Sequence, residues 1–212
     1  MILDLDRLRA APLLRDPFEF VVVENFIDSQ RLPALLADYP VIRGNGSYPL
    51  GSLTCGGAFE ALADELEGEG LRRAIEDKFA IDLAGRPTMI TARGQSDGKD
   101  GRIHTDSSTK LITVLLYMNE SWGDSGGRLR ILRGARDLDD CAAEIAPLAG
   151  TMVAFRRSNA SFHGHHAHCG TRRVLQLNWV TDAAVVRREL GRHGWSARLK
   201  ALNPFARAAS VA

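Results

Sequence analysis

Four residues in the second half of the chain have the types and the spacing that a metal-dependent reaction would use. His104 and Asp106 stand two positions apart, His163 follows much later, and Arg173 begins an apolar run. If residues 102–106 form a strand, the side chains of His104 and Asp106 point to the same face. Two imidazoles and one carboxylate make the facial triad that binds non-haem Fe(II) and leaves coordination positions open. The spacing therefore predicts an iron site with an anionic co-substrate beside it.

The third metal ligand has to be chosen among four neighbouring histidines, His163, His165, His166 and His168. His163 follows the apolar Phe162 and best fits the start of a strand. The other three precede Gly170 in a segment that we expect to be irregular. We therefore predict His163 as the third ligand, with His165 and His166 as the alternatives or as assisting groups.

The arginine at the start of the strand 173–181 is the candidate for binding an anion. Arg173 shares one face of this strand with Leu175, Leu177 and Trp179. An arginine on an apolar face is costly unless it is paired, and the strand has no acidic residue to pair with it. A guanidinium can hold a carboxylate through two parallel hydrogen bonds. We therefore predict Arg173, rather than Arg172, as the carboxylate-binding residue; the other interpretation is an arginine that reaches solvent at a strand end.

Residues 111–118 are apolar on both faces, which predicts a strand that is buried on both sides. Thr113 and Tyr117 lie on the same face of this strand. Buried hydroxyl groups need hydrogen-bond partners. The functional interpretation is that both hydroxyls bind a ligand carboxylate, and the alternative is that they form hydrogen bonds within the core.

The elements that must position these residues are short strands separated by turn signals. The predicted strands are 89–92, 102–106, 111–118, 128–132, 151–155 and 173–181. Short, closely spaced strands of this kind favour an antiparallel sandwich or barrel. The preceding part predicts a strand at 18–26, a helix at 28–39 and helices at 59–66 and 71–79, which we expect to cover one side of a sheet. The glycine-rich loop 43–57 and the polar loop 93–101 are expected to line the substrate entrance.

Composition limits the function classes further. The 212 residues carry a net charge of +1, which gives no reason to expect nucleic acid as a partner. The three widely spaced cysteines do not form a disulfide pattern and favour reduced thiols in the cytoplasm. The N-terminus does not read as a signal peptide, and no run approaches the roughly 20 apolar residues of a membrane span.

The end of the chain, residues 183–202, is basic and has helical spacing interrupted by Gly191 and Gly194. We expect a helix that packs on the sheet or on a second subunit, which would make a homodimer. The alternative is an amphipathic helix on a membrane surface.

In this order, the motifs resemble the Fe(II)- and 2-oxoglutarate-dependent oxygenase superfamily, particularly its prolyl-hydroxylase-like branch. The matching segments are His104-Thr-Asp106, Leu-Leu-Tyr117-Met-Asn119 followed by Trp122 and Ser125-Gly-Gly127, Pro147 to Phe155, Ser161-Phe-His163-Gly, and Arg173 with Trp179.

The resemblance implies a fold that is mainly β with flanking helices (α+β), a double-stranded β-helix or jelly roll with helices packed on one sheet. We expect a single domain over residues 1–212. Its core would be at about 86–182, its strand–helix cover at 18–85 and its helical tail at 183–212.

The resemblance also implies Fe(II) held by His104, Asp106 and His163, with 2-oxoglutarate as co-substrate and O₂ as oxidant. Arg173 would bind the distal carboxylate with the help of Tyr117, and Arg93 falls where relatives often contact the co-substrate. Many relatives have a serine two residues after the arginine, where this chain has Leu175, so Tyr117 or Thr113 would have to supply that contact.

The implied activity is a dioxygenase that hydroxylates an unactivated C–H bond of a small molecule or of a protein or peptide residue, with release of succinate and CO₂. Related halogenases replace the carboxylate ligand, so Asp106 favours hydroxylation. The alternative is a non-catalytic jelly-roll protein whose histidines hold a structural or sensing zinc ion. Such a site needs a fourth ligand, which His165 or His166 would supply, and it has no use for Arg173.

Overall fold

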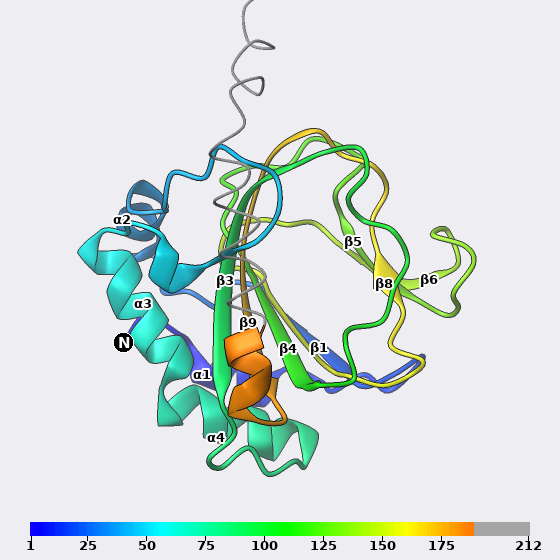
Figure 1. Ribbon diagram of the computed structural model, residues 1–212, viewed down its shortest axis with the longest axis horizontal. Helices are drawn as coiled ribbons and strands as arrows, with labels where there is room; N and C mark the ends of the chain where they lie inside the picture. The colour runs from blue at the N-terminus through cyan, green and yellow to red at the C-terminus, as the bar shows by residue number, and fades with distance from the viewer. Residues whose placement is uncertain (189–212) are drawn as a thin grey trace, which may run out of the picture.

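Two antiparallel sheets face one another in the computed structural model, which describes residues 1–188 (Figure 1). The larger sheet has the order β1 (Phe20–Val23), β7 (Met152–Arg156), β4 (Lys110–Tyr117), β9 (Gly170–Val180), β3 (Thr88–Ser96) and β2 (Tyr48–Pro49). The smaller sheet has the order β6 (Cys141–Ile145), β5 (Leu129–Leu132) and β8 (His163–Gly164). The predicted fold class, a mainly β jelly roll with flanking helices, is confirmed.

The helices pack on the outer face of the larger sheet (Figure 1). They are α1 (Leu5–Ala10), α2 (Leu32–Ala37), the 3₁₀ turn η1 (Leu50–Ser52), α3 (Gly57–Glu67) and α4 (Glu69–Phe79). Their apolar faces share one buried cluster with Val114 of β4 and with Leu177 and Trp179 of β9. Helices thus cover one face of this sheet, as expected, and leave its other face to the smaller sheet. Within residues 1–188, no helix is long and apolar enough to cross a bilayer.

A second apolar cluster fills part of the space between the two sheets. It contains Tyr117, Leu129, Phe155 and Val174 among its buried members. Strand β4 contributes alternate side chains to both clusters, so it is buried on both sides, as its sequence predicts. The rest of the space between the sheets is polar and contains the candidate site.

The register of β9 decides which side chains face that space. Tyr117 of β4 lies opposite Val174, and Thr113 lies opposite Asn178. Directly opposed residues of an antiparallel pair project to the same face. Even-numbered residues of β9 therefore face the smaller sheet, and odd-numbered residues face the helices.

Three features differ from the sequence-based expectations. Residues 102–106 are not a strand, because only His104 makes an isolated bridge there. Strand β3 extends from Thr88 to Ser96, so Arg93 lies within the sheet and not in a loop. Strands β2 and β6 and helix α1 have no counterpart among the predicted elements. The chain is helical from residue 183 to 188, and the rest of the predicted tail helix lies outside the described residues.

Candidate active site

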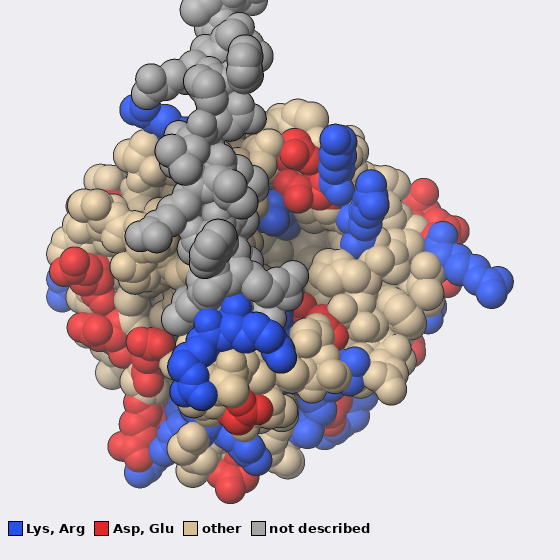
Figure 2. Space-filling model, in the orientation of Figure 1, with Lys and Arg blue, Asp and Glu red and all other residues tan. Residues whose placement is uncertain are grey.

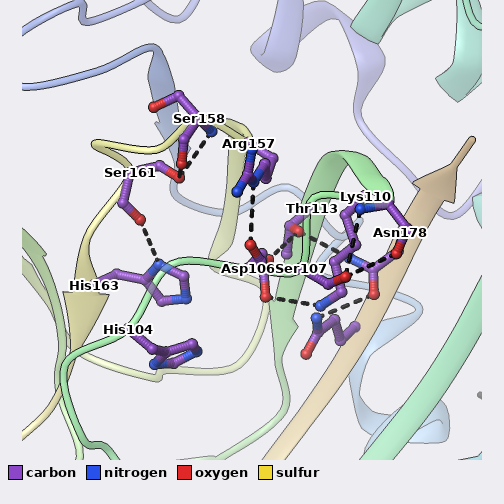
Figure 3. Close-up of polar contacts among 12 residues, drawn as sticks. His104, Asp106, Ser107, Lys110, Thr113, Arg157, Ser158, Ser161, His163 and Asn178 are labelled. Carbon is purple, nitrogen blue, oxygen red and sulfur yellow. Dashed lines mark hydrogen bonds and ion pairs between the residues drawn. The ribbon is translucent and has the colours of Figure 1, made fainter.

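His104, Asp106 and His163 come together between the sheets. Each offers one ligand atom, and the three atoms lie within 4.8 Å of one another (Figure 3). A pair of backbone hydrogen bonds fixes the two histidines side by side: the amide of His104 donates to the carbonyl of His163 at 3.1 Å, and the reverse bond measures 2.9 Å. The extended segment before β4 and strand β8 thus bring together residues that are far apart in the sequence.

Each of the two imidazoles has one ring nitrogen whose lone pair is free to bind a metal. Nδ1 of His104 lies 2.8 Å from the carbonyl oxygen of Arg102, and Nδ1 of His163 lies 3.0 Å from that of Ser161. A carbonyl only accepts, so Nδ1 is the donor in both rings and Nε2 keeps a free lone pair. Burial lowers the pKa of His163 to about 4, which keeps this ring neutral at pH 7.

The Asp106 carboxylate is held at both of its oxygens. The Thr113 hydroxyl donates to Oδ2 at 2.5 Å, and Lys110 Nζ donates to Oδ1 at 2.8 Å (Figure 3). Burial opposes the charged form of this carboxyl. The ammonium of Lys110 and the hydrogen bonds outweigh that effect and hold the pKa of Asp106 below its usual value.

A chain of hydrogen bonds fixes the direction of the Thr113 hydroxyl. Asn178 Nδ2 donates to Thr113 Oγ1 at 2.8 Å, and Gln176 Nε2 donates to Asn178 Oδ1 at 3.1 Å. Because Thr113 accepts from Asn178, its single proton is available for Asp106. The sequence predicts that Thr113 contacts the co-substrate, whereas in the structure its hydroxyl is bonded to Asp106.

A cavity of about 250 Å³ opens beside the three clustered residues. Its walls include Thr91, Arg93, Asp100, Leu115, Leu129, Phe155, His165, Arg172, Val174 and Gln176. Figure 2 shows a hollow on this face of the molecule with basic and acidic side chains around it. Ser47, from the segment 43–57, and Asp100, which follows β3, also line the cavity.

Arg172 is the buried cation of this cavity. Only 6% of its surface is exposed, and its Nε donates to the carbonyl of Gly127 at 2.8 Å. Among residues 1–188, no carboxylate forms an ion pair with its guanidinium, which lies over the ring of Tyr117 at 5.4 Å from the centroid. Burial lowers the pKa of Arg172, the sign of a charge that is costly to keep at this depth. A bound anion would offset this cost.

Tyr117 has an unsatisfied hydroxyl at the same place. The side chain is fully buried, and among the described residues its hydroxyl makes no hydrogen bond of good geometry, although the Arg172 guanidinium lies near enough to interact with it. Buried hydroxyls are nearly always satisfied in proteins. An unpartnered hydroxyl beside an uncompensated guanidinium is what a site for a ligand carboxylate requires.

Arg173, the predicted carboxylate-binding residue, does not line this cavity, whereas its neighbour Arg172 does. Its guanidinium lies on the helix side of the sheet, over the ring of Tyr39 at 5.4 Å from the centroid. The face that Arg173 shares with Leu175 and Trp179 is indeed apolar, but it packs against the helices. On the other face of β9, the polar residues Arg172, Gln176 and Asn178 line the cavities. Their spacing of two or four residues could have indicated in the sequence that this face meets a polar site.

The remaining predicted residues are split between the cavity and the surface. Arg93 lines the cavity and forms an ion pair with Asp100 at 2.6 Å. His165 also lines it without joining the metal-type cluster, and burial lowers its pKa to about 4. His166 is half-exposed and lies 2.8 Å from Asp139. In the described part of the chain, neither histidine supplies a fourth ligand to the cluster.

Comparison with known proteins agrees with this geometry. Residues 90–181 match the family model described as the 2OG-Fe(II) oxygenase superfamily. No curated protein matches the sequence.

Similar solved structures include three prolyl hydroxylases. The prolyl-4-hydroxylase of Pseudomonas putida has a TM-score of 0.58 at 20% identity, over 84% of this chain and 97% of the other. A prolyl 4-hydroxylase from Phytophthora capsici has a TM-score of 0.56 at 18% identity, over 87% and 68%. The viral collagen prolyl hydroxylase from Paramecium Bursaria Chlorella virus-1 has a TM-score of 0.54 at 14% identity, over 79% and 99%.

At these identities the structural likeness is one of fold, and the sequence match to the family model is confined to residues 90–181. The resemblance that the motifs predicted is therefore confirmed: residues 90–181 match the 2OG-Fe(II) oxygenase superfamily, with a prolyl-4-hydroxylase-like fold around His104, Asp106 and His163.

Proposed function

We propose that this protein is an Fe(II)- and 2-oxoglutarate-dependent dioxygenase that hydroxylates a C–H bond and releases succinate and CO₂. The observation that carries the proposal is the pairing of two features in one cavity. The cluster of His104, Asp106 and His163 supplies a metal-ligand set, and the buried Arg172 beside Tyr117 supplies an anion site.

The ligand set fits Fe(II). Two imidazoles whose Nδ1 atoms are bonded to carbonyl oxygens and one carboxylate are the donors that non-haem iron takes, and three ligands leave positions open for other molecules. When bound, the metal and 2-oxoglutarate would together activate O₂. The protein's own residues would hold the ligands in place, with the Thr113 hydroxyl fixing the carboxylate of Asp106.

The anion site fits the distal carboxylate of the co-substrate. Arg172 would pair with this carboxylate, and the Tyr117 hydroxyl would donate a hydrogen bond to it. Arg172 would thus take the role that the sequence predicts for Arg173. Leu115, Phe155 and Val174 line the same cavity and would keep water away from the bound molecule.

The zinc alternative has less support. A structural zinc site is closed by four ligands, and the described residues bring only three together. A zinc site also leaves the buried Arg172 without a role. We therefore favour the oxygenase.

We also propose a substrate class, a domain organisation and a cellular location for the enzyme. The substrate is a small molecule or a peptide, and the chain functions as one domain because the helices and the larger sheet share a core. A cytoplasmic location is in keeping with the cysteines, since Cys55, Cys141 and Cys169 are all unpaired.

The test is optical and needs no substrate. Fe(II) and 2-oxoglutarate added together without oxygen should give the visible charge-transfer band of the chelate. Admission of air should then give succinate. An Asp106→Ala variant should give neither signal. Absence of both signals from the wild-type protein would contradict the proposed function.

A further inference from the structure

We propose that Lys110 binds an acidic group of the substrate, and that the substrate is a small aliphatic molecule with one negative charge. This inference rests on the proposed function. It concerns the part of the site that the metal and the co-substrate would leave open.

A second cavity, of about 290 Å³, continues the first along β9. Arg172 lines only the first cavity, Gln176 lines both, and Asn178 and Val180 line only the second. His104 and Asp106 also line both. The metal-type cluster therefore lies between a co-substrate end near Arg172 and a second end that a substrate could enter.

The walls of the second cavity define what fits there. Met89, Val180 and Val185 form an apolar part, whereas Thr91, Gln176 and Asn178 offer neutral hydrogen-bonding groups. Lys110 is the one lysine or arginine among its described lining residues. A site with these groups suits an aliphatic body with a single acidic group.

Lys110 is placed to exchange partners when a metal ion binds. Its side chain is 16% exposed, it lines both cavities, and its Nζ lies 2.8 Å from Asp106 Oδ1 (Figure 3). A divalent cation bound to Asp106 would compete for the same carboxylate and repel the ammonium. Lys110 would then need another anion in the water-poor space where it lies.

The charges of the assembled site leave Lys110 unbalanced. Arg93 is already paired with Asp100. The two charges of 2-oxoglutarate and the one of Asp106 would offset those of Fe(II) and Arg172. Among the described residues that line the two cavities, Lys110 then remains as the cation without a counter-ion. One substrate carboxylate would supply that counter-ion, whereas a neutral peptide segment would not.

The experiment compares butyrate with butyramide, which differ little in shape but carry one charge and none. Each is titrated without oxygen into the Fe(II)- and 2-oxoglutarate-loaded protein, and the shift of the charge-transfer band and the heat of binding are recorded. Butyrate should bind at least about tenfold more tightly than butyramide, without loss of the band, as expected for one charge-assisted contact.

Three variants test whether Lys110 causes the tighter binding of butyrate than of butyramide. Lys110→Met should lose the preference and keep the band, whereas Lys110→Arg should keep both. Lys99→Met removes an exposed charge that lines neither cavity and should behave as the wild type.

Several outcomes would overturn the inference. Equal binding of the two probes to the wild type would do so, as would a preference that persists in Lys110→Met. Loss of the band in Lys110→Met would assign Lys110 to the metal site alone. Displacement of the band by butyrate would place the probe at the co-substrate end. A wild-type protein that never gives the band would fail at the proposed function itself, which is a separate result.

Discussion

At the scale of single residues, Arg172 and Arg173 form a matched pair. They are neighbours in β9, yet one guanidinium faces the cavity and the other faces the helices. We predict that Arg172→Met raises the 2-oxoglutarate concentration for half-saturation by roughly 10- to 100-fold, the loss expected when a charge-assisted carboxylate contact is removed.

The matched Arg173→Met variant should change the same concentration by less than about threefold, because its side chain does not line the cavity. The measurement is a titration of the charge-transfer band. The reverse order of effects would restore Arg173 as the carboxylate-binding residue.

Thr113 allows a second test at this scale, because it contacts the predicted metal ligand Asp106 and lies behind it. Thr113→Val removes the donor to Asp106 and leaves the amide of Asn178 without an acceptor. We expect metal affinity to fall by about tenfold or more, as is usual when a group that orients a ligand is lost. Calorimetric titration with Co(II) measures this.

Thr113→Ser keeps the hydroxyl and is the control. It should bind Co(II) within about threefold of the wild type. If Thr113→Val binds as tightly as Thr113→Ser, then Thr113 does not orient Asp106.

At the scale of elements, the segment before His104 depends on a glycine. Gly101 has φ of +85°, and a Cβ there would lie 2.3 Å from the ring Nδ1 and the carbonyl oxygen of His165. We predict that Gly101→Ala shifts the segment away from β8 and weakens both folding and 2-oxoglutarate binding, which thermal unfolding and the optical titration would measure.

Gly85 supplies the control for backbone strain, since its φ is +67° and a Cβ there meets no atom within 4 Å. Gly85→Ala should cost about 1–2 kcal/mol of stability and leave binding intact. Equal effects of the two substitutions on both measurements would show that the contact with His165 is unimportant.

The sequence predicts these elements well where local periodicity determines them. The apolar run of β4 and the helical spacing of α3 and α4 are clear in the chain and are present in the structure. Strand β6 (Cys141–Ile145) lacks such a signal because its Ala-Ala-Glu segment is neither alternating nor β-branched.

The site was predictable only in part, because the sequence of β9 does not reveal its pairing register with β4. Which face of β9 meets the cavity depends on Tyr117 lying opposite Val174, a pairing between strands that are far apart in the chain. The alternation of β9 separates Arg172 from Arg173 but does not say which of them is inside. Lys110 gave no signal, since a lysine at the start of a strand is usually solvated.

At the scale of the whole molecule, buried histidines make stability depend on pH. The folded-state pKa is about 4 for both His163 and His165, below the usual 6.5, because burial opposes their charge. The unfolded chain therefore binds more protons between pH 6.5 and 4. The free energy of unfolding is therefore highest above pH 6.5. It falls as the pH is lowered toward 4, by roughly 1 kcal/mol per pH unit for each histidine.

Urea unfolding of the metal-free protein at pH 7, 6 and 5 would measure this slope. His165→Gln should reduce the slope, because it removes one of the two buried imidazoles with a lowered pKa. A stability that is constant from pH 7 to 5 would show that neither buried histidine resists protonation.

The backbone bridge between His104 and His163, which holds the metal-type cluster together, also affects how the protein unfolds. His163 belongs to the smaller sheet, whereas Asp106 is bonded to Thr113 in the larger one. An ion bound to both would cross-link the two sheets and close a long loop of intervening chain. Because that cross-link would exist only in the native protein, it would lower the rate of unfolding and leave the rate of folding almost unchanged.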